Sequence, residues 1–563
     1  MASPDEEVQP HRHPAKPLPF ELVQHVAIFF EERLHTQALN LLLDVLSSNP
    51  NADTPVFVPS SQHLALAATF LVHTSTTARP KTTEEEQAPN VSLRLLRLVN
   101  SLVGPRTAQF QIAFTFTHFE TSRRGGRRYA DDGSTKTLAA KTLNLDRDID
   151  IDLAQSASVW SRAEDFWHAV GWAFNCAVLH PARWRHWRIW LEFMCEVLEE
   201  DWAERQREWE DDPKHDDQIL KDSMMVRYIN TSQTGFGRHR RILRSIFADG
   251  GALAVGEFRE VFDKELKLSR KKKDKEKDAK KRAVKVDIDA EEYGDFYATS
   301  DHDDEGGSSG RESKRPRRAA TRSRRAAAAA AAETPTSNST PDSSTPDQTL
   351  ASSLLGDMTS LALRQRLLHL LSAVSHAVPT DFMELQDLYH LFVENIRPLP
   401  LPIYQSFISP LSLPFFSPAA HSTLCEMLLF RLRETAAPTS DDGYLTQNKL
   451  ETCFLPFAAA TPSLSDNVKM SITLEALLIL LADSNMLAIT DETKLLTKQG
   501  ICRRADRAQH ETRKSLSARI SEDLEWSWLT ESAERLTFLV EEIIPLSASA
   551  KGSSSGTSPT PGG

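Results

Sequence analysis

Arginine and tryptophan alternate over a short stretch of the chain, and these two residue types together can bind nucleic acid. Indole rings stack on bases and guanidinium groups contact phosphates. Trp and Arg are also enriched at the energetic centres of protein–protein interfaces. The alternating residues are Arg183, Trp184, Arg185, Trp187, Arg188 and Trp190. The stretch therefore indicates a nucleic-acid platform, a partner-binding surface or a buried core.

The spacing of the apolar residues favours the core. Pro181 can begin a helix, because proline is tolerated in the first turn. In that helix one face carries apolar side chains at steps of three and four, namely Trp184, Trp187, Leu191, Met194, Leu198 and Trp202. Trp190 and Phe193 lie off this seam. We predict that these two rings, with Arg183 and Arg188, could bind a helix of a partner protein, and we favour this interpretation over nucleic-acid binding.

Two basic clusters further along are typical of nuclear import signals. One is Lys314, Arg315, Arg317 and Arg318, and the other contains Lys271, Lys272 and Lys273. A compact run of charge in a flexible segment suits capture by an acidic groove on an import receptor. The alternative is a solvated linker that touches nucleic acid without sequence specificity. The basic residues 122–129 could make a similar contact, although an ordinary solvated turn is the simpler interpretation.

An acidic segment separates the two basic clusters and contains a candidate phosphorylation site. Ser300 precedes Asp301, Asp303, Asp304 and Glu305, a context typical of acidophilic kinases. Phosphate on Ser300 would add negative charge that competes for the flanking basic runs.

The common catalytic and cofactor motifs do not occur in this sequence. Gly235-Phe236-Gly237 lacks the third glycine of a dinucleotide motif, and no phosphate-binding Gly-Lys-Ser/Thr loop occurs. The His and Cys spacings of zinc sites and the Gly-x-Ser-x-Gly nucleophile turn do not occur either. We therefore expect a protein that is not an enzyme and holds no cofactor or metal.

Composition adds an expectation about compartment. The five cysteines are odd in number and widely spaced, which predicts free thiols in a reducing compartment rather than a disulfide framework. We see no secretory signal in residues 1–19 and no apolar run near the roughly 20 residues of a membrane span. With the basic clusters, these features predict an intracellular protein of the nucleus that does not bind a membrane.

Apolar periodicity predicts helices through most of the chain. The expected helices cover residues 20–45, 61–71, 91–103, 155–179, 181–212, 217–229, 236–247, 255–268, 354–371, 381–395, 419–434, 447–454, 466–482, 491–513 and 520–543. The end of the helix over 181–212, residues 199–212, is acidic and expected to be exposed. Residues 110–116 alternate as a strand would, although we lean towards helix there. Residues 75–90 and 398–418 are expected to be irregular.

Five regions follow from this pattern. Residues 1–19 are expected to be a disordered N-terminus, 20–268 an N-terminal helical region, 269–349 a disordered charged insert, 350–546 a C-terminal helical region and 547–563 a disordered tail. The expected class is all-α, either an irregular α-solenoid or two helical bundles. We expect a nuclear scaffold or adaptor subunit of a multiprotein assembly, in chromatin or genome maintenance. The alternative is a nucleic-acid-binding protein that acts through its basic segments in DNA, RNA or ribosome processing.

Overall fold

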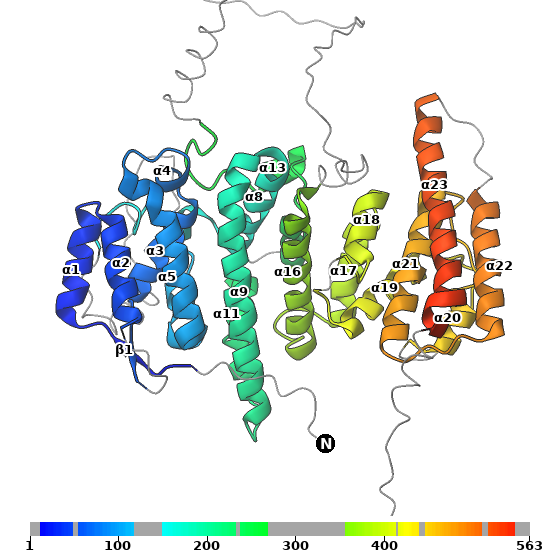
Figure 1. The fold of residues 1–563 in the computed structure, drawn as a ribbon, viewed down its shortest axis with the longest axis horizontal. Helices are drawn as coiled ribbons and strands as arrows, with labels where there is room; N and C mark the ends of the chain where they lie inside the picture. Colours follow the sequence, from blue (N-terminus) through cyan, green and yellow to red (C-terminus); the bar gives the residue numbers. More distant parts are fainter. Residues whose placement is uncertain are drawn as a thin grey trace, which may run out of the picture. The chain divides into compact units, whose positions relative to one another are not determined.

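A computed structural model describes the residues 12–48, 54–117, 149–231, 237–267, 355–412, 415–438, 445–508 and 516–546. This part of the chain is predominantly helical, which confirms the predicted class (Figure 1). The chain divides into two compact units, residues 1–268 with 345–563, and residues 269–344. All described residues belong to the first unit.

The one sheet among the described residues is small and was not predicted. Strand β1 (Ala15–Pro17) pairs in parallel with β2 (Val56–Val58). The Lys16 ammonium group lies 4.0 Å from the centre of the Phe57 ring. This pairing orders a segment that the sequence predicted to be a disordered N-terminus, because β2 offers it backbone partners that composition does not reveal.

The N-terminal helices differ from the predicted ones at two places. The single helix expected over residues 20–45 is two, α1 (Phe20–Glu31) and α2 (His35–Leu46), because Arg33 has a left-handed backbone with φ of 61°. Helix α3 (Ser61–Val72) begins where predicted. The expected loop at 75–90 instead holds α4 (Thr74–Thr77) and the start of α5 (Thr83–Thr107), which contains Gly104 with φ of 78°.

The tryptophan region is built from two short helices and a long one. After the short helix α6 (Phe110–Ala113), the helix predicted for 155–179 is divided into α7 (Val159–Arg162) and α8 (Phe166–Leu179). Asp165 causes this division: its carboxylate accepts a hydrogen bond from the His168 N–H at 2.7 Å and caps α8. Helix α9 (Pro181–Asp211) begins at the predicted proline.

Further helices complete each half of the unit. Those before the insert are α10 (Gln218–Lys221), α11 (Met224–Thr231), α12 (Arg238–Ile246) and α13 (Ala252–Glu257). Those after it are α16 (Met358–Ala377), α17 (Leu385–Ile396), α18 (Leu401–Ile408), α19 (Pro418–Leu432), α20 (Gln447–Cys453), α21 (Leu464–Asp483), α22 (Asp491–Ala508), α23 (Leu516–Phe538) and a π-helical turn, η1 (Leu539–Ile543). Helix α18 lies in the segment expected to be irregular, because Pro402 occupies its first turn, where proline is tolerated.

Neighbouring helices pack in sequence along the unit. Contacts join α1 to α2, α2 to α5, α5 to α9, α9 to α16, α16 to α17, α17 to α19 and α19 to α21, and α21 packs against both α22 and α23 (Figure 1). The buried apolar side chains of both halves belong to one core. The two helical regions predicted from the sequence are therefore one packed body.

Arg364 on α16 is one of the polar links between the helices before the insert and those after it. Its side chain is fully buried, and its two terminal nitrogens donate to backbone carbonyls of Ile246, Ala248 and Leu355. The guanidinium carbon lies 4.1 Å from the centre of the Phe174 ring on α8. Burial lowers the pKa of Arg364 to about 9. This side chain therefore donates hydrogen bonds to backbone carbonyls that come before the insert and to one that comes after it.

Candidate functional site

The tryptophan helix α9 lies in the core, with its predicted seam inward. Trp187, Trp190 and Phe193 are each 0% exposed. The prediction that Trp187 is core is confirmed. The expectation that Trp190 and Phe193 offer surplus aromatic surface to a partner is corrected, because α9 packs against α3, α5, α8, α11 and α16 and is covered on several sides.

Arg183 is also buried, and its charge is paired inside the protein. Its Nε and Nη2 donate to Glu265 Oε1 at 2.8 and 2.6 Å, and its Nη1 donates to the Thr77 hydroxyl at 2.7 Å. Arg188 lies at the surface, where its Nε is 3.6 Å from Glu192 Oε1. Of the four residues proposed for partner binding, Arg188 alone is accessible.

The same face of α9 holds both ends of the insert. Glu265 lies just before the insert. Its carboxylate accepts hydrogen bonds from Arg183 and, at 2.7 Å, from the Trp187 indole N–H. The Trp184 indole donates to Asp357 Oδ2 at 3.0 Å, and Asp357 caps α16 just after the insert. Arg183, Trp184 and Trp187, which resembled part of a base-stacking platform, therefore hold the described residues on either side of the insert, Glu265 and Asp357, against α9.

The residues predicted for nuclear import and phosphorylation lie outside the described part of the chain. They are Lys271, Lys272, Lys273, Ser300, Lys314, Arg315, Arg317 and Arg318, and the basic residues 122–129 lie outside it as well. These assignments stay predictions.

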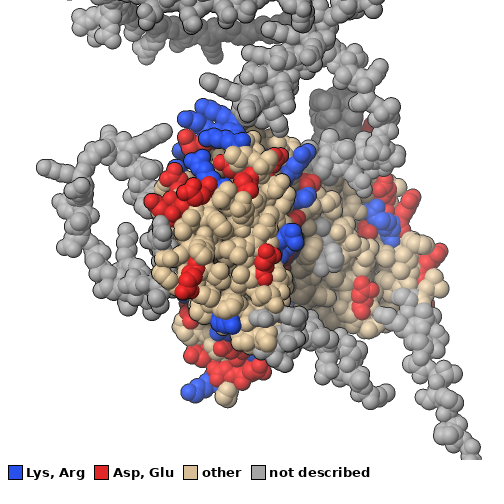
Figure 2. Space-filling view, turned by 60° about the vertical axis from the view of Figure 1, so that its left-hand side comes forward, with Lys and Arg blue, Asp and Glu red and all other residues tan. Residues whose placement is uncertain are grey.

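On the face seen in Figure 2, basic side chains lie among acidic ones, and acidic side chains gather at the lower end, where α9 ends. Glu208, Glu210 and Asp211 are exposed there, as the sequence predicted for the end of this helix. Asp201 differs from that prediction: it is buried, and its Oδ1 accepts from Arg205 Nε at 3.0 Å. The exposed end of α9 is thus suited to cationic partners rather than to phosphates.

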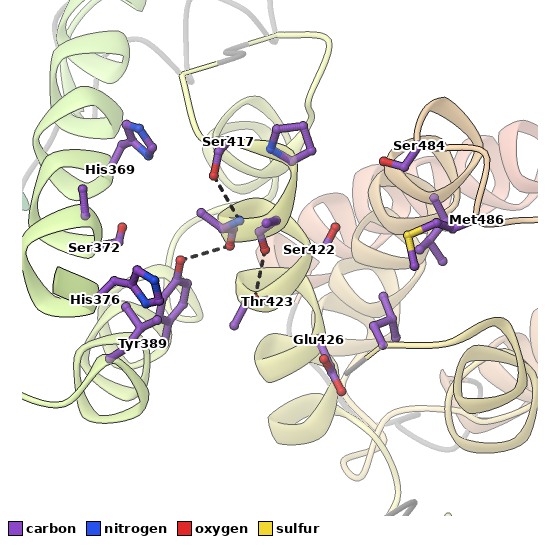
Figure 3. A pocket seen from close by; sticks show the side chains of 17 residues that line it. His369, Ser372, His376, Tyr389, Ser417, Ser422, Thr423, Glu426, Ser484 and Met486 are labelled. Atoms are coloured by element: carbon purple, nitrogen blue, oxygen red, sulfur yellow. Dashed lines mark hydrogen bonds between the residues drawn. The ribbon is translucent and has the colours of Figure 1, made fainter. Parts of the chain in front are cut away.

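A hollow of about 890 Å³ over helix α19 is a candidate binding site. One wall is formed by α16 and α17, and the other by the end of α21 and the turn that follows it (Figure 3). We call this hollow the α19 groove. The side chains that face it are mostly small or apolar, among them Ala373, Leu385, Ala419, Ala420, Leu445, Leu481 and Met486.

A hydrogen bond between α17 and α19 forms the floor of the α19 groove. The Tyr389 hydroxyl donates to the Ala420 carbonyl at 3.2 Å (Figure 3). Burial raises the pKa of Tyr389 to about 12, so this phenol stays protonated and keeps donating. The Ser417 side chain caps α19 by accepting from the Ala420 N–H at 3.3 Å. These two hydrogen bonds connect α17 to α19 and cap the start of α19 at the floor of the groove.

A second, smaller hollow extends the α19 groove along the same helix. It is lined by Gln386, His390, Glu426, Met427, Phe430 and Arg431, and it shares Glu426 with the first. Glu426 Oε1 lies 2.7 Å from the Lys449 ammonium group, so its charge is already paired. The two hollows together follow α19 from Ser417 to Arg431, roughly 20 Å at 1.5 Å per residue.

The α19 groove also contains histidines and hydroxyl groups. His369 and His376 lie on α16, and Ser422 and Thr423 lie across the hollow on α19 (Figure 3). Burial lowers the pKa of His369, while the charge of Glu199 opposes that shift. The Nδ1 atom of His369 has no hydrogen-bond partner, so it does not activate a serine in this geometry.

No group of three or more His, Cys, Asp or Glu side chains among the described residues is placed to hold a metal ion. None of the helices in the described part of the chain is both long and apolar enough to cross a membrane.

No protein-family description matches this chain, and no curated protein is significantly similar to it. Sequence reasoning missed the α19 groove, because its lining residues come from five segments and are small, common residue types without a motif.

Proposed function

We propose that the protein is a nuclear, non-enzymatic helical scaffold or adaptor subunit of a multiprotein assembly, with chromatin or genome maintenance as its setting. Its helices would form an irregular, solenoid-like array, consistent with the packing of each helix against the next. The basic clusters at Lys314–Arg318 and Lys271–Lys273 would deliver it to the nucleus through an import receptor. The observation that carries the adaptor part of this proposal is the α19 groove.

The groove suits one elongated apolar occupant, an amphipathic helix of a partner protein. Small side chains such as Ala373, Ala419 and Ala420 let another backbone approach closely, and the hollow follows the length of α19. Helix-in-groove recognition inserts large apolar side chains at helical spacing into such a surface. Leu385, Leu481 and Met486 would supply the apolar contacts for them.

Affinity purification of the full chain from nuclease-treated nuclear extract tests the proposal. Ala419 is exposed and lines the groove, so Ala419→Arg should place a charge there without disturbing the core. We expect wild type to retain a stoichiometric partner and Ala419→Arg to lose it. Ala203→Arg, at an exposed position of α9, is the matched control and should keep the partner. Equal recovery with both variants would contradict binding in the groove.

The second candidate function is direct nucleic-acid binding through the basic segments, and the charge clustering of the insert favours it. Binding through phosphate contacts would weaken steeply with salt. Deleting residues 268–325 should then abolish salt-dependent binding to DNA or RNA. The deletion must start after Glu265, because that carboxylate is buried against Arg183. If the wild-type chain shows no salt-dependent binding to DNA or RNA, or if the deletion leaves that binding unchanged, the scaffold proposal is favoured.

A further inference from the structure

Arg504 on helix α22 is a buried cation without an anionic partner among the residues that the structure describes. Its side chain is about 1% exposed. Its Nη1 donates to the backbone carbonyls of Phe457 at 3.1 Å and Leu455 at 3.4 Å, in the turn that follows α20. Its Nε and Nη2 have no hydrogen-bond partner. Half of this guanidinium is therefore satisfied and the other half is not.

The unpartnered half is the edge that binds oxyanions. In a guanidinium group the Nε and Nη2 donors are parallel and match two oxygens of a carboxylate or phosphate. This protein uses that edge repeatedly. Arg97, Arg244 and Arg366 each donate Nε and Nη2 to the two oxygens of a glutamate, at distances between 2.5 and 3.2 Å. In Arg504 both donors of this edge, Nε and Nη2, are buried and have no hydrogen-bond partner among the described residues.

A cavity lies beside Arg504. It has a volume of about 160 Å³ and lies between α21, α22 and α23. Its other lining residues are Ser471, Ile501, Ala505, Trp526, Leu529, Thr530 and Ala533. The space exceeds the roughly 10–15 Å³ that one water needs, and it is below the roughly 300–1,000 Å³ of sites for drug-sized ligands. A small ion fits this size.

The electrostatics around Arg504 also favour a bound anion. Burying a charge without a partner is unfavourable, because the lost hydration is not replaced. Burial lowers the pKa of Arg504 to about 10, and no neighbouring carboxylate opposes the shift. The buried Arg183, by comparison, has Glu265 as its counter-ion. An anion beside Arg504 would balance its positive charge and accept hydrogen bonds from Nε and Nη2.

We propose that the cavity between α21, α22 and α23 is a binding site for one small free oxyanion of the phosphate or sulfate class. Arg504 is its bidentate ligand through Nε and Nη2. Ser471 lines the same cavity and brings a hydroxyl donor for a further oxygen, whereas the Thr530 hydroxyl already donates to the Trp526 carbonyl at 3.0 Å. The site is separate from the α19 groove and does not depend on the scaffold function.

The competing explanation is that Arg504 only fastens the turn between α20 and α21. Arg503 Nη1 donates to the Pro456 carbonyl at 3.2 Å, and Arg507 Nη2 donates to the Ala460 carbonyl at 3.0 Å, so three arginines of α22 hold this turn. A structural role accounts for Nη1 of Arg504. It leaves Nε and Nη2 unexplained, and it predicts no response to phosphate.

Calorimetric titration and thermal unfolding of the full chain separate the two explanations. The probes are inorganic phosphate and sulfate, with chloride at matched ionic strength as the reference. We expect one phosphate bound per chain and an unfolding midpoint that rises with phosphate concentration beyond the chloride reference. A wild-type protein that binds no phosphate, or whose midpoint follows ionic strength alone, overturns the proposal.

Two variants and a control assign the site. Arg504→Met removes the guanidinium, and Arg504→Lys keeps a positive charge without the bidentate edge. Both should lose the phosphate-dependent rise in midpoint. Arg507→Met, on the same helix and against the same turn, should keep it. If Arg504→Met does not fold, the Lys variant decides. Phosphate binding that persists in Arg504→Lys with unchanged affinity overturns the assignment.

Discussion

Arg183 on α9 and Glu265 before the insert form an ion pair buried on both sides, with side-chain exposures of 6% and 0%. The carboxylate Oε1 accepts from Nε, Nη2 and the Trp187 indole. The partners are 82 positions apart in the sequence, so this is a long-range tether. It fixes the chain where the insert begins.

Removing the charge of Glu265 should strongly destabilise the protein. Glu265→Gln leaves the Arg183 guanidinium buried without a counter-ion, and breaking such a pair costs about 3–5 kcal/mol. The free energy of unfolding in urea measures the loss. Asp263→Asn is the control: this neighbouring carboxylate is 75% exposed, so its loss should change stability by less than about 0.5 kcal/mol. A small effect at Glu265 would mean that the tether is dispensable.

Truncating Trp187 should create a cavity in the core. The ring is 0% exposed and stacks on Phe262 with 6.1 Å between ring centres. We expect Trp187→Ala to lower the free energy of unfolding by about 3–5 kcal/mol. Leu253→Ala, at a side chain that is 91% exposed, should leave the melting curve unchanged. An unaltered curve for Trp187→Ala would contradict the burial of the ring.

His63 should make the protein less stable as the pH falls. Burial lowers its pKa from 6.5 to about 4. The unfolded chain therefore binds more protons between these values, and stability is lost as the pH drops through that window, by up to about 3 kcal/mol. His63 Nδ1 also accepts from the Ser60 backbone N–H at 3.3 Å, which requires an unprotonated Nδ1.

His63→Gln removes this titration and keeps the helix cap, since Ser-x-x-Gln is a capping box. Its unfolding midpoint should fall less steeply than that of wild type between about pH 6.5 and 4. His25→Gln, at an exposed position of α1, should reproduce the wild-type slope. Parallel profiles for wild type and His63→Gln would assign the acid sensitivity to other buried histidines.

The nuclear prediction can be tested by microscopy. Replacing Lys314, Arg315, Arg317 and Arg318 with alanine should move a fluorescently tagged full chain to the cytoplasm, because an import receptor would lose its charge contacts. Replacing Lys271, Lys272 and Lys273 tests whether the second cluster contributes. Unchanged nuclear fluorescence with both clusters replaced would exclude these signals.

Local pattern was sufficient to predict the helical class and several helix starts. Steps of three and four placed Trp184 and Trp187 on one face of α9, and Pro181 marked its first turn, because both signals act within a few residues. The same signals failed at the Arg33 turn and at the Asp165 cap. Apolar periodicity continues across a break when both flanking helices bury the same face.

Only the tertiary structure could decide what the polar residues of this core do. Arg183 meets Glu265 across 82 residues, and Trp184 meets Asp357 across 173. No local rule relates such positions, since they become neighbours only when α9 packs between the two halves of the chain. The α19 groove and the unpaired Nε and Nη2 donors of Arg504 likewise arise from the packing of segments that are distant in the sequence. The sequence by itself determined a helical protein with an aromatic core and a charged insert. Packing determined that Arg183 and the tryptophans at 184, 187 and 190 face inward.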